Sequence, residues 1–173
     1  MSESKTSNTT PSNNQLGFKP LSEADVANAM KKLASADPKE LNDIFNKYAQ
    51  ALNGVLVMAQ KQAVDETEII EVERIKRIVN FVPVEERFIR TKDKIWAVRE
   101  HIINKNAKYF MEKDYSAAIK KDGNQAMIET LVDLVKEKFA TITEQEKDFY
   151  WKKGAMMLNC IVRFKKLVGE YDK

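Results

Sequence analysis

Two rows of apolar side chains repeat every seven residues between positions 84 and 113, and no other feature of the chain constrains its fold as much. An α-helix turns by about 100° per residue, so residues seven apart lie on nearly the same side of it. The rows are Phe88, Ile95, Ile102, Tyr109 and, beside them, Ile89, Trp96, Ile103, Phe110. This pattern predicts one continuous helix over 84–113 with a broad apolar face.

A line of polar side chains interrupts that apolar face. Its members are Glu85, Lys92, Arg99 and Asn106. Either the line divides the face between two neighbouring helices of the same chain, or it sets the register of a bound partner, as polar seam residues do in coiled coils. The residues that we expect to contact such a partner are Lys92, Trp96, Arg99, Ile103 and Phe110.

The opposite side of the same predicted helix is basic. It consists of Arg87, Arg90, Lys94, His101, Lys105 and Lys108. At 1.5 Å per residue these side chains span about 30 Å, which is enough to follow several phosphates. Binding of nucleic acid or another polyanion through backbone charge is therefore an alternative function, and it would depend strongly on salt. An ordinary solvated helix face explains the same residues without any ligand.

The scarcity of Gly and Pro residues predicts helices in the rest of the chain as well. Five Gly and four Pro among 173 residues leave few turn signals, whereas β-rich folds need many. Helix starts are indicated at Ser22, at Asp37-Pro38 and at the capping box that begins with Thr143. Apolar residues at three- and four-residue spacing continue these helices, and another such stripe covers 127–139.

The expected fold is an all-α bundle of five or six helices. Residues 68–82 favour a helix, although their β-branched side chains leave a strand open as the alternative. Residues 1–20 contain too few apolar groups to offset the entropy of ordering, so we expect a disordered N-terminal arm. Residues 21–173 would then form a single helical domain, with the last helix at its centre or at an oligomer interface.

Candidates for catalysis are scarce. His101 is the only histidine, which excludes multi-histidine metal sites, and its place among lysines predicts a solvated side chain. Cys160 lies in the apolar stripe of the last helix and is expected to pack in the core rather than act as a nucleophile. No phosphate loop or dinucleotide fingerprint is present. We therefore expect no enzymatic activity, no metal and no cofactor.

Charge and cysteine content indicate where the protein acts. Residues 1–70 hold seven Lys or Arg against nine Asp or Glu, and residues 71–173 hold 22 against 17. One cysteine, no apolar leader and no apolar run of about 20 residues favour a reducing, intracellular compartment without secretion or a membrane span. The favoured function is a structural or assembly protein that binds protein partners or its own copies through apolar helical faces, conceivably in a larger particle.

Overall fold

The computed structural model describes residues 21–114 and 127–170. The predicted N-terminal arm, residues 1–20, lies outside the described residues. Within the two described ranges the chain is all-α, as predicted, and no strand is present. The strand alternative for 68–82 is wrong, because these residues belong to a helix and its C-terminal cap.

The described ranges contain eight α-helices. They are α2 (Glu23–Lys32), which continues into the 3-10 turn η1 (Leu33–Ser35), α3 (Pro38–Gln62), α4 (Glu66–Phe81), α5 (Val84–Ala97), α6 (Arg99–Ile103), α7 (Ala107–Glu112), α9 (Met127–Phe139) and α10 (Glu144–Leu167). The predicted starts are confirmed: Ser22 and Thr143 form reciprocal capping boxes, and Asp37 caps a helix whose first residue is Pro38. Such caps satisfy backbone N–H groups that have no partner within the helix.

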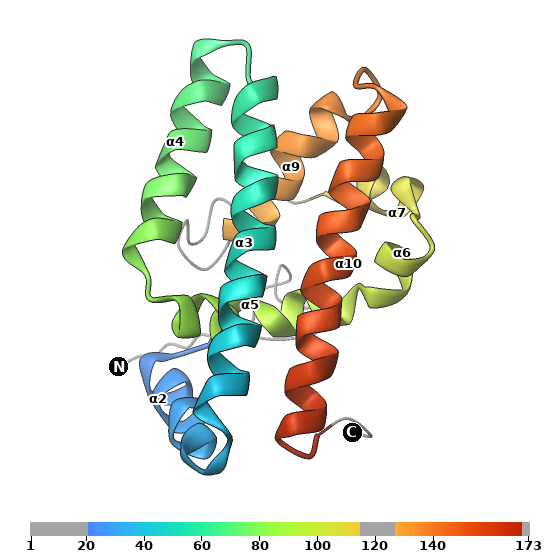
Figure 1. Ribbon diagram of the computed structural model, residues 1–173. Helices are drawn as coiled ribbons and strands as arrows, with labels where there is room; N and C mark the ends of the chain where they lie inside the picture. The colour runs from blue at the N-terminus through green and yellow to red at the C-terminus, as the bar shows by residue number, and fades with distance from the viewer. Residues whose placement is uncertain (1–20, 115–126, 171–173) are drawn as a thin grey trace, which may run out of the picture.

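The single helix predicted over 84–113 is wrong. The chain leaves helical geometry at Val98, between α5 and α6, and again before α7, where Lys105 has a positive φ of 51°. Asn106 does not join a polar seam, because its side chain accepts a hydrogen bond from the backbone N–H of Tyr109 (3.2 Å) and caps α7. The seven-residue rows are thus divided among three helices that point in different directions (Figure 1).

Helices α3 and α10 lie side by side at the centre of the bundle, which confirms the central place predicted for the last helix (Figure 1). Helix α4 folds back along α3 at the outer edge, and α9 packs against both. A Cβ atom at Gly54 of α3 would lie 3.0 Å from Cε of Lys153 on α10, so the Lys153 side chain packs over this glycine. Helix α5 crosses the bundle and contacts both α3 and α10.

Phe88 of α5 is the centre of the core. Its ring is fully buried, and its centroid lies 5.3 Å from that of Phe45, 4.9 Å from Tyr48 and 4.9 Å from Phe164. Three helices, α3, α5 and α10, therefore meet at one aromatic cluster. Cys160 is buried, as predicted, and burial raises the pKa of its thiol, which opposes formation of the thiolate.

A chain of two hydrogen bonds, the one between side chains buried, joins α3 to α5. The Thr91 hydroxyl donates to the carbonyl oxygen of Arg87 (2.7 Å) and lies 2.6 Å from the Tyr48 hydroxyl. Because Thr91 uses its single proton on Arg87, it accepts the proton of Tyr48. Burial raises the pKa of Tyr48, so the phenol remains a donor. This arrangement satisfies both hydroxyls in the core.

Glu68 is a charged residue that the fold buries, at 8 % exposure. Its carboxylate accepts a hydrogen bond from the backbone N–H of Asp65 (3.3 Å) and forms an ion pair with Lys138 of α9 (2.8 Å). The hydrogen bond from Lys138 is the main cause that lowers the pKa of Glu68. The pair connects the start of α4 to α9.

We expect the Glu68→Gln variant to lose less stability on acidification than the wild type. The pKa of Glu68 is lower in the folded than in the unfolded chain. The ionised carboxylate therefore contributes its full stabilisation above the unfolded pKa of about 4.3, and this stabilisation is lost as the pH falls through the lower folded value. Melting temperatures measured between about pH 6 and pH 3 should therefore fall less steeply in this variant. The exposed Glu137 of α9, changed to Gln, is the matched control. Equal slopes for all three proteins would contradict the assignment.

Candidate functional site

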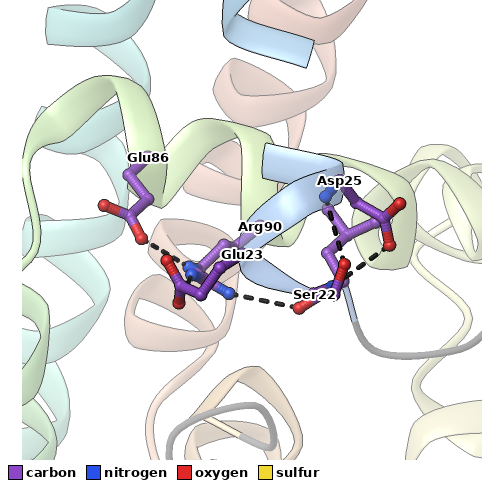
Figure 2. Close-up of polar contacts among 6 residues, drawn as sticks. Ser22, Glu23, Asp25, Glu86 and Arg90 are labelled. Atoms are coloured by element: carbon purple, nitrogen blue, oxygen red, sulfur yellow. Dashed lines mark hydrogen bonds and ion pairs between the residues drawn. The ribbon is translucent and has the colours of Figure 1, made fainter. Parts of the chain in front are cut away.

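Arg90, the second residue of the predicted basic face, fastens α2 to α5 (Figure 2). Its Nε atom donates to Glu86 (2.8 Å), and its terminal nitrogens donate to the backbone oxygen of Leu21 (3.3 Å) and to Glu23 of α2. Two carboxylates of the same chain thus balance the charge of this guanidinium. Arg90 has a structural role that its position on a helical projection did not indicate.

Two other residues of the predicted basic face also point toward the protein. Nε of Arg87 donates to the carbonyl oxygen of Val82 (2.6 Å), and burial lowers the pKa of its guanidinium. Lys94 is only 9 % exposed and lines a cavity between helices. The expectation that these residues form a solvated face is therefore wrong, because α5 is surrounded on more sides than its apolar rows suggested.

His101 is half-buried, which corrects the prediction of a solvated side chain. Its ring stacks on that of Tyr109 with centroids 3.7 Å apart and planes within 4° of parallel. The Asn106 side-chain amide donates to Nδ1 (3.0 Å). These contacts connect α6 to α7 across the turn at Lys105. His101 thus helps to fix the bend between the two helices.

Only two of the six basic residues remain well exposed. Lys105 forms an ion pair with Asp148 of α10 (3.3 Å), and Lys108 lies 4.0 Å from Glu112. The six residues therefore lie on three helices and on the turn between α6 and α7, and they do not form a continuous cationic strip. Polyanion binding stays a prediction. The single basic helix face on which it was based is not present in the structure.

The residues predicted to bind a partner are divided in the same way. Trp96 is half-buried between the Arg99 guanidinium, 4.6 Å from the ring centroid, and the Lys165 ammonium, 4.9 Å from it. Nζ of Lys92 lies 5.8 Å from the centroid of the Phe164 ring. The long polar side chains thus cover aromatic surface of their own chain. This fits the alternative in which the polar line divides the apolar face between neighbouring helices of the same chain.

Ile103 and Phe110 have opposite environments. Ile103 is 68 % exposed at the end of α6, where it could contact a partner. Phe110 packs against Trp151 of α10, with ring centroids 6.1 Å apart. Contact of the five predicted residues with a partner stays a prediction, and Ile103 is the member whose exposure fits it best.

A cavity of about 170 Å³ lies where α3, α5, α6, α7, α9 and α10 meet. Its walls are almost entirely apolar and include Ile95, Ile102, Leu131 and Met157. Sequence analysis did not predict this cavity. Its position follows from the bends that separate α5, α6 and α7, because these bends place apolar side chains around a space instead of along one line.

The outer face of α4 is the second feature that sequence analysis missed. Ile70 is 55 % exposed and Phe81 is 90 % exposed, while Val72, Ile75 and Val79 on the opposite side are fully buried. At about 100° per residue, positions 70, 74, 77 and 81 fall within about 60° of one another. Two arginines, Arg74 and Arg77, therefore lie between the exposed apolar residues. The signal was present in the sequence as a second stripe opposite the buried one.

Neither metal chemistry nor a membrane segment is indicated by the described part of the chain. Residues 21–114 and 127–170 contain no group of three or more His, Cys, Asp or Glu side chains that could hold a metal ion. No helix in these ranges combines the length and the apolar character that crossing a membrane requires.

The chain matches no protein-family model, no curated protein and no solved structure. In the described ranges, fold and surface together define an all-α bundle with an apolar cavity and an exposed apolar and basic face on α4.

Proposed function

We propose that this chain is a non-enzymatic, intracellular assembly protein that binds another protein through the outer face of α4. The observation that supports the proposal is the exposure of Phe81, 90 %, in line with Ile70, 55 %, on a helix at the edge of the bundle (Figure 1). Single exposed apolar residues are ordinary on protein surfaces. Two on one line of one helix, with arginines between them, have the composition of an interface centre.

The geometry of α4 suits a partner that lies along the helix. Ile70 and Phe81 are eleven positions apart, which is about 16 Å on an α-helix. Burial of each side chain would contribute about 1.5–3 kcal/mol from the apolar surface removed from water. Arg74 forms an ion pair with Glu71 on the same helix, and Arg77 is exposed. A partner therefore meets two apolar anchors separated by positive charge.

The charges favour a different protein over a second copy of this chain. In an antiparallel pair of α4 helices, the register that places Ile70 against Phe81 of the copy also places Arg74 against Arg77. Like charges in direct opposition destabilise an interface. The partner that fits best presents a carboxylate between two apolar side chains. Membership in a larger particle would follow if that partner is itself a particle subunit.

The double variant Ile70→Ser/Phe81→Ser tests this proposal. We expect affinity capture with the tagged full chain to recover a partner that the variant loses, and the purified pair to bind about 30-fold more weakly or worse, as is typical for loss of an interface hot spot. Arg74→Glu/Arg77→Glu should weaken the same complex. Light scattering should show that the isolated chain is a monomer.

Ile103→Ser is the matched control, because the exposure of Ile103, 68 %, lies between those of Ile70 and Phe81, but Ile103 is on α6. If this variant loses the partner and the α4 variant keeps it, the interface belongs to the region of 84–113 and the α4 proposal is wrong. An α4 variant that retains every partner and a stable dimer of the wild type would each contradict the proposal as well.

A further inference from the structure

We infer that the cavity between α3, α5, α6, α7, α9 and α10 is a binding site for a small, uncharged, apolar molecule, about the size of one substituted aromatic ring. This site is separate from the outer face of α4, since none of Ile70, Arg74, Arg77 and Phe81 is among the residues that line the cavity. The inference therefore does not depend on the proposed function.

The size of the cavity supports this ligand class. Its volume is about 170 Å³, and it is partly open to solvent. An engineered apolar cavity of about 150 Å³ in another protein stays free of water and binds benzene. Water is a poor occupant of such a space because it needs two to four polar partners.

The polar side chains in the described walls are already engaged. The Tyr150 hydroxyl donates to Gln62 (2.6 Å), and Nζ of Lys136 donates to the carbonyl oxygen of Lys113 (2.8 Å). Lys94 is buried and also has an interaction partner. A charged ligand would have to displace these contacts and lose its own hydration. An uncharged ligand displaces none of these contacts and gives up no hydration of a charge.

One wall of the cavity is aromatic. Trp151 of α10 lies between Phe110 of α7 and Phe139 of α9, with ring centroids 6.1 Å and 5.8 Å away and tilted or edge-on geometry. All three residues line the cavity. Aromatic groups prefer offset or edge-to-face contact with other rings. This wall therefore favours a ring-shaped ligand over a flexible chain.

Titration of the full chain with toluene tests the inference. We expect the melting temperature to rise by about 3–5 °C at a toluene concentration ten times its Kd. With methyl-labelled methionine, the NMR signals of Met111 and Met157, which line the cavity, should shift. Those of Met30 and Met58, which do not line it, should stay in place. Benzoate, the charged counterpart, should cause neither effect.

Val132→Phe places a larger side chain at the cavity wall and should abolish both effects of toluene. Val57→Phe is the matched control, because it makes the same change on an exposed position of α3 outside the cavity, and it should respond as the wild type does. If Val132→Phe does not fold, Ala107→Leu at another wall position replaces it. Absence of any toluene effect on the wild type, equal effects in the filled variant, or preference for benzoate would each overturn the inference.

Discussion

Replacement of Phe88 by alanine is expected to lower the free energy of unfolding by about 3–5 kcal/mol. The ring is fully buried and contacts Phe45, Tyr48 and Phe164, so its removal leaves a cavity among three helices and three other rings. The surrounding side chains cannot collapse into that space without moving α3 or α10. Urea denaturation followed by circular dichroism would measure the change.

Phe81→Ala is the control for this prediction, since the same residue type is there almost fully exposed. Its effect on stability should stay within about 0.5 kcal/mol. A loss below about 1 kcal/mol for Phe88→Ala, or similar losses in both variants, would mean that Phe88 is not the centre of the core.

Replacement of Thr91 by valine is expected to lower the free energy of unfolding by about 1–3 kcal/mol. The change keeps the shape of the side chain but removes the acceptor of the Tyr48 hydroxyl, which lies 2.6 Å away in a fully buried environment. A buried donor without a partner keeps the whole penalty of losing water. Chemical denaturation again measures the loss.

The double variant Tyr48→Phe/Thr91→Val should recover most of the stability lost by Thr91→Val alone, because it removes both polar groups from the core. Tyr48→Phe alone should cost little, since Thr91 still donates to the Arg87 carbonyl (2.7 Å). If the two single losses simply add in the double variant, the hydroxyls are not coupled in the way the distances indicate.

Local chemistry made the helix starts predictable from sequence. Ser22 and Thr143 are each followed three residues later by an acidic residue that completes a capping box, and this pattern involves only neighbours in the chain. The helical interpretation of 68–82 was correct for a related reason. Val72, Ile75 and Val79 keep the three- and four-residue spacing of one buried face, which outweighed their β-branched side chains.

The two breaks in 84–113, at Val98 and before α7, were not predicted because no Gly or Pro marks either of them. For the second break a signal was available in the pair of asparagines that flank Lys105, since Asn is common at turns and helix starts. Apolar repeats report which residues prefer burial and do not report whether the helix is continuous. Rows divided among three helices satisfy the same preference.

The candidate sites differ in how far sequence could have shown them. The stripe of Ile70 and Phe81 on α4 follows from helical geometry alone, once the buried stripe opposite is recognised. The cavity depends on the packing of six helices, and the burial of Lys94 depends on what surrounds α5. Neither the cavity nor the burial of Lys94 is determined within one helix, so the spacing of apolar residues along the sequence could not predict them.

The attachment of α2 has a consequence for how the molecule opens. Val26 is the one residue buried within this helix, and Arg90 of α5 holds it through the Glu23 carboxylate and the backbone oxygen of Leu21. Dissolved ions weaken such pairs and leave an aromatic core nearly untouched. As ionic strength increases, α2 should therefore be the first helix to separate from the bundle, and the remaining helices should stay packed together.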